Sequence, residues 1–123
     1  MNGREVLREV FRSAVGAARG DLLLRNHAAL DGDRWSYQHG DLTQSVLLPP
    51  VATGGRILVV GAGKAAAALA LGLEATLGAR INRGAIVVKT GHAVPLQRIR
   101  VFEAAHPVPD QAGVQATREI LDL

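Results

Sequence analysis

The sequence predicts an α/β fold, in which helices pack on a sheet that is at least partly parallel. A short β-branched run over 57–60 is followed by a glycine-containing turn and by an alanine- and leucine-rich stretch that ends near Leu77. A second apolar run over 85–88 completes a strand–helix–strand pattern. Aromatic residues make up only 3% of the 123 residues, so small and aliphatic side chains must form the core.

The composition indicates one compact domain over 1–123 and excludes several classes of protein. Twelve arginines and two lysines give a formal charge of +3 without any basic run, so nucleic acid is not an expected partner. No cysteine is present, which excludes disulfides and cysteine-based metal sites. The chain starts without an apolar signal core, and no apolar stretch reaches the ~20 residues that span a bilayer. We therefore expect a cytoplasmic protein without membrane contact.

The amino-terminal region predicts two helices. The first covers 5–18, where apolar residues recur at three- and four-residue spacing and indicate one buried stripe. Gly20 ends it, and Asp21 is placed to cap a second, shorter helix that runs to about Leu30. The stripe of the first helix consists of Val6, Leu7, Val10, Phe11, Ala14, Val15 and Ala18.

The polar segment 31–42 predicts a small hairpin, because it is rich in turn residues and carries Trp35 and Tyr37 at alternating positions. Two interpretations of these aromatic residues stay open. They stack on a ligand, or, as is more usual for isolated aromatics, they pack against the layer formed by the first two helices.

The centre of the chain predicts one right-handed βαβ unit over 57–88. Its first strand, 57–60, has the character of a strand that is buried on both faces. The helix, Lys64–Leu77, is so rich in alanine and leucine that we expect it to be buried on nearly every side. Gly78 then ends this helix.

The last part of the chain predicts a strand over 99–104 and a final helix from about Gln111 to Leu123. The connection over 90–98 is too short for a crossover helix, so the direction of the strand stays open. Asp110 stands at the N-cap position of the final helix. The apolar stripe of this helix consists of Val114, Thr117, Ile120 and Leu121.

The turn Gly61-Ala62-Gly63, between strand and helix, is the first candidate site. Glycines let a phosphate approach backbone amides at the positive end of a helix dipole. Lys64 would then stand in the first turn of the helix, where its ammonium group could neutralise phosphate oxygens during phosphoryl transfer. The same glycines are also compatible with a purely structural tight turn, so both interpretations stay open.

Two other nucleotide sites fit these residues less well. A Walker A loop needs an earlier glycine and a Ser or Thr after the lysine, whereas Leu58 and Ala65 occupy these positions. An NAD site needs an acidic residue at the end of the second strand, where Lys89 and Thr90 stand. Lys89 could instead meet the 2′-phosphate of NADP, which keeps an NADP site open.

The run His106-Pro107-Val108-Pro109-Asp110 is a second candidate site, because its prolines hold His106 and Asp110 in a fixed relation. The plainer interpretation is a loop in which Asp110 caps a helix and His106 is partly buried. His92 follows a predicted strand, where α/β proteins place ligand contacts. The four histidines lack metal-ligand spacing, so we predict no metal site made by protein side chains.

Several of these segments resemble the glycerate 2-kinase family of bacteria and animals. The resemblance rests on 57–66 with its Gly-Ala-Gly-Lys run, on 84–92, and on 103–110 with its His-Pro-Val-Pro-Asp run. Order and spacing agree throughout, and the amino-terminal helix is similar too. The resemblance therefore covers essentially the whole chain.

The resemblance implies a Rossmann-like portion of an enzyme that transfers the γ-phosphoryl group of ATP, with Mg²⁺, to the 2-hydroxyl group of D-glycerate. The lysine of the glycine turn is the family's catalytic lysine, a role that falls on Lys64, with Gly61, Ala62 and Gly63 beside the phosphate. His106 and Asp110 match a family motif.

Family members are several times longer, and they continue into a Ser-Gly-Gly-rich loop and a second domain. The resemblance therefore implies that the second domain is absent here, that the missing carboxy-terminal portion is an expected partner, and that the chain is inactive alone. Self-association is also compatible with the sequence.

Two other functions stay open. Some members of the family are labelled hydroxypyruvate reductase, so an NADP-dependent reductase fragment is one alternative. The other is a non-catalytic remnant or association module, which exposes the apolar surface that a missing domain would cover.

Overall fold

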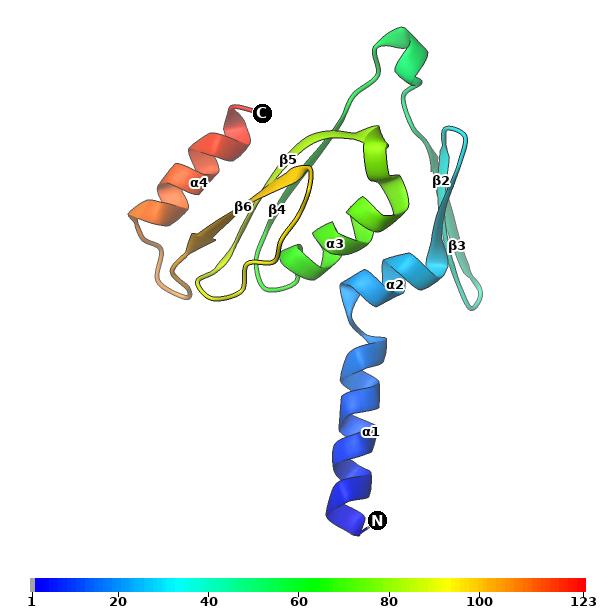
Figure 1. The fold of residues 1–123 in the computed structure, drawn as a ribbon, viewed down its shortest axis with the longest axis vertical. Coiled ribbons are helices and arrows are strands. Elements are labelled where there is room, and N and C mark those ends of the chain that lie inside the picture. The colour runs from blue at the N-terminus through cyan, green and yellow to red at the C-terminus, as the bar shows by residue number, and fades with distance from the viewer. Residues whose placement is uncertain (1) are drawn as a thin grey trace.

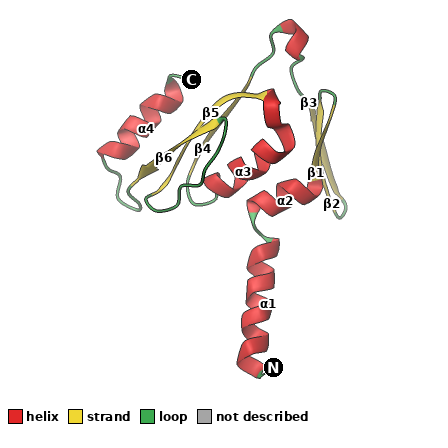
Figure 2. Ribbon diagram, viewed as in Figure 1, coloured by secondary structure: helices red, strands yellow, loops and turns green. Residues whose placement is uncertain are grey.

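A computed structural model describes residues 2–123 and confirms the α/β fold. Figures 1 and 2 show a parallel sheet between two helices, with a small antiparallel sheet on the far side of one of them. The helices are α1 (Gly3–Ala17), α2 (Gly20–His27), α3 (Ala66–Leu77) and α4 (Gln111–Leu121), with short 3₁₀ turns at Val51–Thr53 and Gly78–Arg80. The strands are β1 (Ala28–Asp31), β2 (Arg34–His39), β3 (Leu42–Leu47), β4 (Ile57–Ala62), β5 (Ile81–Lys89) and β6 (Ile99–Ala104).

The parallel sheet has the strand order β4-β5-β6, and both pairings are parallel. The open question about the direction of 99–104 is thereby answered, and the strand–helix–strand unit over 57–88 is confirmed. The expectation that 57–60 is buried on both faces was wrong. β4 is an edge strand with alternating burial, so Val59 packs on the core while Leu58 and Val60 remain exposed.

An irregular connection over 90–98 joins β5 to the parallel strand β6. A single carboxylate holds its end, because Glu74 of α3 accepts hydrogen bonds from the consecutive backbone amides of Gln97, Arg98 and Ile99 at 2.7–3.1 Å. The bonded amides are the last two of the connection and the first of β6. A helix side chain therefore replaces the crossover helix that usually places a parallel strand.

Helix α3 forms the centre of the core, between the parallel sheet and α2 (Figure 1). It begins at Ala66, so Lys64 precedes the helix and does not stand in its first turn as expected. The expectation of burial on nearly every side also needs correction, because Leu69 is 43% exposed. The buried members of the helix are Ala66, Ala67, Ala70, Gly72 and Leu77.

Helix α2 differs from the prediction at both ends. It ends at His27, and β1 follows at once. Asp21 is not its cap but a buried residue of the first turn, and the Arg19 guanidinium donates to both of its oxygens at 2.9 and 3.1 Å. These hydrogen bonds lower the pKa of the Asp21 carboxyl below its ordinary value of 3.8, against the opposing effect of burial.

The Asp21–Arg19 pair predicts an acid-sensitive contribution to stability. Because the folded-state pKa is depressed, the contribution is complete above the unfolded value of about 3.9 and is lost as pH falls through the folded value. We expect Asp21→Asn to cost about 1–2 kcal/mol at pH 7 and progressively less below pH 4. Urea unfolding of both proteins between pH 7 and pH 3 measures this difference, and a constant difference would exclude the ionised carboxylate as its source.

The segment predicted as one hairpin is part of a three-stranded antiparallel sheet, β1-β2-β3. Trp35 packs against the main core, and its indole N–H donates to Thr76 Oγ1 of α3 at 3.4 Å. Packing is therefore confirmed for Trp35, although its partner is α3 rather than the first two helices. The ring of Tyr37 meets that of His27 edge to face, with centroids 5.9 Å apart.

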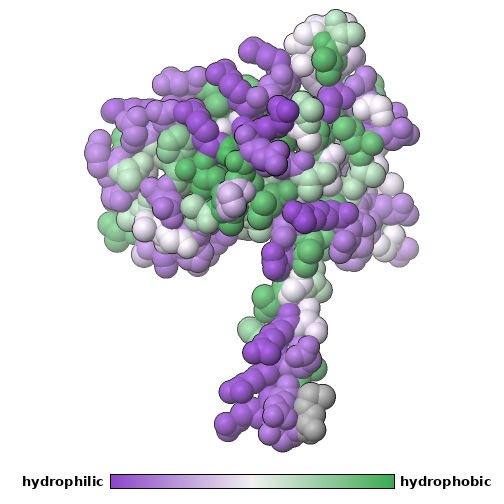
Figure 3. Space-filling model, viewed as in Figure 1, coloured by the Kyte–Doolittle hydropathy of each residue, from purple (hydrophilic) through white to green (hydrophobic). Residues whose placement is uncertain are grey.

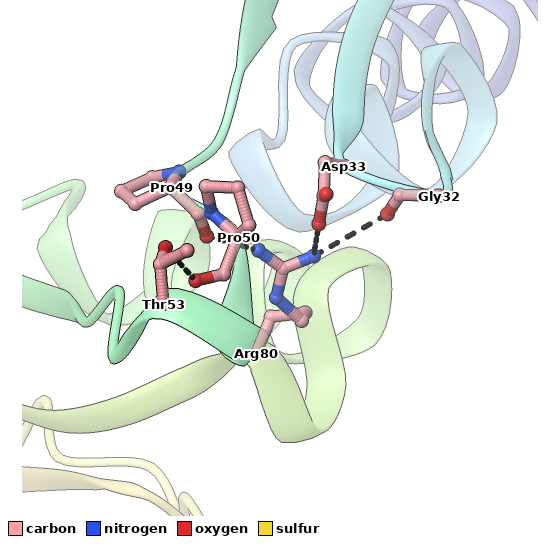
Figure 4. A network of polar contacts seen from close by, with 6 residues as sticks. All are labelled: Gly32, Asp33, Pro49, Pro50, Thr53 and Arg80. Atoms are coloured by element: carbon pink, nitrogen blue, oxygen red, sulfur yellow. Dashed lines mark hydrogen bonds and ion pairs between the residues drawn. The ribbon is translucent and has the colours of Figure 1, made fainter.

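Arg80 fastens the antiparallel sheet to the rest of the fold (Figure 4). Its guanidinium donates to Asp33 Oδ1 at 2.7 Å, to the Gly32 carbonyl at 3.3 Å and to the Pro49 carbonyl at 2.8 Å. The Arg80 side chain is only 15% exposed. One residue between α3 and β5 therefore fixes both the β1–β2 turn and the segment that leaves β3.

Helix α1 is confirmed, but its apolar stripe is not buried by residues 2–123. The helix projects from the body as a stalk, and apolar and polar side chains both lie open along it in Figure 3. Phe11 and Leu7 are 69% and 71% exposed. No helix within the described part of the chain is long and apolar enough to cross a membrane.

Helix α4 packs on the face of the sheet opposite α3, against β5 and β6 (Figure 1). Asp110 is confirmed as its N-cap, because its side chain accepts from the Gly113 amide at 3.0 Å. The predicted apolar stripe was only partly correct. Ala116 is the buried contact and Ile120 is half-buried, while Val114 and Leu121 remain exposed.

Candidate functional site

A cleft of about 180 Å³ opens at the carboxyl ends of the parallel strands. In α/β sheets this edge is where ligands bind. It joins segments that are far apart in the sequence: the turn after β4, the end of β5 and the residues that follow β6. Its lining consists of Gly63, Lys64, Val87, Val88, Lys89, Ala104, Ala105 and His106.

The glycine turn closes tightly onto β5. The Gly63 amide donates to the Val87 carbonyl at 3.0 Å, and Gly63 has a φ of +106°, which favours glycine. A side chain at Gly61 would meet Ile86 Cγ2 at 3.2 Å and Ala66 Cβ at 3.7 Å. Both glycines therefore have structural roles, and the Gly63 amide is already committed to a protein acceptor.

The amides that follow the turn are the donors that remain for an anion. In residues 2–123, the backbone amides of Lys64, Ala65, Ala67 and Ala68 have no protein acceptor, whereas the Ala66 amide donates to the Gly63 carbonyl at 3.2 Å. Ala65 is the N-cap of α3 and offers no side-chain oxygen to the helix. The start of α3 therefore keeps unsatisfied amides beside the cleft.

Both lysines of the sequence, Lys64 and Lys89, line this cleft. Each is exposed, and neither forms an ion pair within the described chain. No carboxylate lines the cleft, and the side chain of Glu103, at the end of β6, accepts from the Gly91 amide at 2.6 Å. Two positive charges therefore converge without compensation, which favours an anionic ligand.

The other predicted residues divide into one that reaches the cleft and two that do not. His106 is exposed and lines the cleft, directly before a cis bond to Pro107. Asp110 lies outside the lining and caps α4. His92 also lies outside it, in a tight turn where its amide donates to the Lys89 carbonyl at 2.9 Å.

Sequence reasoning placed Lys89 only in an NADP site and did not include it among the site residues. The signal was available, because Lys89 ends the second strand of a βαβ unit and its neighbours in the sheet fix it at the same edge as the glycine turn. His106 reaches the same edge only because β6 runs parallel to β5, and the sequence left the direction of this strand open.

The residues present fit one phosphate group better than a whole cofactor. Ligand pockets for drug-sized molecules usually measure about 300–1,000 Å³, so a cleft of about 180 Å³ suits a phosphoryl group rather than an entire nucleotide. Mg²⁺ prefers oxygen ligands. The cleft has no carboxylate, and no group of three metal-ligating His, Cys, Asp or Glu side chains occurs among residues 2–123, so these residues do not make a Mg²⁺ site.

A family model described as a domain of unknown function, DUF4147, matches residues 6–123. The chain belongs to this family. The resemblance to glycerate 2-kinases is confirmed by relatives that bear that name.

Three proteins that are similar to this DUF4147 chain are several times longer than it is. A protein of Agrobacterium vitis with the provisional name hydroxypyruvate reductase is 34% identical over 120 residues, which cover 98% of this chain and 23% of the relative. The D-glycerate 2-kinase of Thermotoga maritima is 39% identical over 69 residues, or 55% of this chain and 16% of the relative.

The crystal structure of a Pyrococcus horikoshii OT3 protein superimposes with a TM-score of 0.74 at 28% identity, and the alignment covers 99% of this chain and 26% of that protein. The chain therefore spans about a quarter, or less, of the length of each of these relatives.

Proposed function

We propose that this DUF4147 chain is the phosphate-binding portion of an ATP-dependent glycerate 2-kinase. The observation that carries the proposal is the convergence of both lysines on one cleft, next to the unpaired amides at the start of α3. Phosphoryl transfer requires little covalent chemistry from a protein, because positioning and charge stabilisation supply most of the catalysis. A cleft with two uncompensated cations meets that requirement. The names of the relatives supply the acceptor, glycerate.

In this proposal each residue of the cleft has a separate task. The amides of Lys64 and Ala65, with those of Ala67 and Ala68, hold phosphate oxygens at the positive end of α3. Lys64 stabilises the negative charge that spreads over the transferred group. Lys89 binds a neighbouring phosphate oxygen from the opposite wall, and His106 orients the group by a hydrogen bond.

The adenosine group and glycerate are bound by contacts outside this cleft. Glycerate needs donors for its carboxylate and a base beside its 2-hydroxyl group, and none of the lining residues is a carboxylate base. We therefore expect the chain to bind the phosphates of ATP and to require the remaining length of the longer relatives for turnover.

Titration of the chain with ATP, followed by the amide NMR signals of 64–68, tests this function. We expect Lys64→Ala to weaken ATP about tenfold, which corresponds to about 1.4 kcal/mol, and Lys89→Ala to weaken it by a smaller factor. Arg12→Ala is the matched control, because it removes one positive charge from exposed helix α1 and leaves the cleft intact. If Lys64→Ala and Arg12→Ala weaken ATP binding equally, the loss of affinity reflects net charge alone, and the proposal is overturned.

A second candidate function is NADP-dependent reduction of hydroxypyruvate. It is favoured by the position of Lys89 at the end of β5, where a cation can meet the 2′-phosphate of NADP, and by the name of the Agrobacterium vitis relative. Parallel titrations with NADPH and NADH separate the two functions. A reductase site would prefer NADPH over NADH through Lys89 and would leave ATP weakly bound.

A further inference from the structure

Strand β4 has no neighbour on its outer side in the described part of the chain. It pairs only with β5, and 57–62 contain no charged residue and no proline. The irregularity in its pairing lies at its start, between Ile57 and Leu58. Edge strands of soluble proteins usually carry charges or prolines or lie under a covering segment, because a bare edge invites another strand. β4 therefore has the character of an inner strand, although it stands at an edge.

Apolar side chains are uncovered on both faces of this edge. On the face of α4, Leu58 and Val60 are exposed, because α4 packs mainly on β5 and β6. On the other face, the exposed side chain of Leu69 borders an apolar groove of about 220 Å³ between β4 and α3. Parallel sheets are normally covered on both faces, and their strands are apolar on both sides. A further strand of this kind would cover the apolar surface on both faces of β4.

The opposite edge of the sheet, β6, is protected by charged side chains. Arg100 forms an ion pair with Glu119 of α4, and its guanidinium lies over the Phe102 ring, 5.4 Å from the ring centroid. Glu103 accepts a hydrogen bond from the Gly91 amide. Charges of this kind hinder the pairing of another strand. The two edges are therefore not equivalent, and β4 is the one that lacks protection.

The path of the chain indicates where a strand after α4 would lie. α3 joins β4 to β5, and the connection 90–98 joins β5 to β6 on the same face, because Glu74 of α3 holds its end. α4 follows β6 on the opposite face (Figure 1). Crossovers between parallel strands are right-handed in about 98% of cases, so a helix on the opposite face returns the chain in the opposite direction. The first free place in that direction is beside β4, because β5 already has a neighbour on each side.

The end of α4 lies at the correct end of the sheet for such a strand. The Leu123 carbonyl, just after α4, accepts a hydrogen bond from the Arg83 guanidinium. Arg83 lies near the start of β5 and pairs in register with Leu58 of β4. A segment that continues from here starts at the amino ends of the strands, where a strand parallel to β4 must also start. The longer relatives have the chain length to supply it.

We propose that the free edge of β4 binds a parallel, apolar β-strand, which the longer polypeptides of the family supply after their counterpart of α4. The order of strands along the sheet then reverses between the added strand and β4. Ligands of open α/β sheets bind at such a reversal, at the carboxyl ends of the strands. The Gly61–Gly63 turn would lie at this point, beside the cleft. The link to the ligand rests on the proposed function, whereas the pairing of the strand does not.

Titration of the isotope-labelled chain with a synthetic peptide, without ATP, tests this edge by NMR. The peptide spans the first apolar run after the matched region of the Agrobacterium vitis relative. We expect the amide signals of 57–62 to shift and their hydrogen exchange to slow by roughly tenfold, while those of 99–104 stay unchanged. Binding at β6, or no binding, would overturn the proposal. Because ATP is absent, a failure of the phosphate site leaves this result unaffected.

Val60→Lys should weaken the peptide by roughly tenfold, because it places a charge among the apolar side chains that the strand would cover. Val46→Lys is the matched control, since Val46 is also an exposed valine of an edge strand, β3 of the antiparallel sheet. Equal losses in the two variants would show that the peptide binds apolar edges without selection, contrary to the proposal. If the unaltered chain instead dimerises through β4 and the peptide does not dissociate the dimer, the occupant is a second copy and the proposal is wrong.

Discussion

Gly72→Ala is expected to destabilise the protein by about 2 kcal/mol, although alanine is the better helix former. Gly72 lies where α3 passes closest to α2. A methyl group there would stand 2.7 Å from Leu24 Cβ and 3.2 Å from Asp21 Cα. Leu24 is buried, so the two helices must move apart. Overpacking of this kind costs about 1–3 kcal/mol, and the gain in helix propensity offsets only about 0.5–1 kcal/mol.

Thermal unfolding measures this prediction, with a loss of roughly 5–10 °C in the melting temperature for a chain of this size. Gly16→Ala is the matched control, because Gly16 lies in α1 and an added methyl group meets nothing within 4 Å. The control should be unchanged or slightly more stable. A Gly72→Ala protein as stable as Gly16→Ala would show that α2 and α3 are not held at this separation in solution.

The sequence predicted the central βαβ unit because its signals are local. A β-branched run, glycines at both ends of a helix and a second apolar run determine these elements within about thirty residues. The N-cap role of Asp110 is equally local, since it depends on one carboxylate and the third amide of the following helix. The structure confirms both of these locally determined predictions.

Other predictions failed where distant contacts decide. Asp21 is buried because Arg19 pairs with it and α3 packs against it. The sequence shows neither contact, and the position of Asp21 before a helical pattern indicates a cap. The exposed side chains Leu58 and Val60 look like core residues in the sequence. Only the position of β4 at the edge of the sheet reveals that the described chain leaves them uncovered.

In the candidate site, too, the features that depend on local signals could be predicted and those that depend on distant contacts could not. The Gly61–Lys64 turn could be predicted as an anion site from strand, glycine and helix alone. The convergence of Lys89 and His106 on that turn requires β5 and β6 to run parallel beside β4, and no local signal encodes the direction of β6. The start of β6 is held by Glu74, a polar residue on a helix that carries no signal of this contact in the sequence.

Glu74→Ala is expected to cost about 3 kcal/mol and to loosen β6 at its start. The carboxylate receives three consecutive amides, at 2.9 Å from Gln97, 2.7 Å from Arg98 and 3.1 Å from Ile99. Hydrogen bonds to a charged acceptor contribute about 1.5–3 kcal/mol each, although bonds that share one carboxylate do not add fully. Ile99 is buried, so its amide would lose its acceptor away from solvent.

Glu74→Gln should be less stable than the unaltered protein but more stable than Glu74→Ala. The Gln amide keeps one acceptor oxygen, but it presents an NH₂ donor to the backbone amides in place of the second oxygen. Glu119→Ala is the control for charge, since Glu119 forms a half-exposed ion pair with Arg100 at 2.8 Å and should cost less than about 1 kcal/mol. Urea unfolding ranks the three variants, and hydrogen exchange at Gln97, Arg98 and Ile99 locates the change. If Glu74→Ala and Glu119→Ala unfold at the same urea concentration, the three-amide contact does not hold β6. The placement of His106 in the cleft would then need another cause, because β6 carries that residue to the glycine turn.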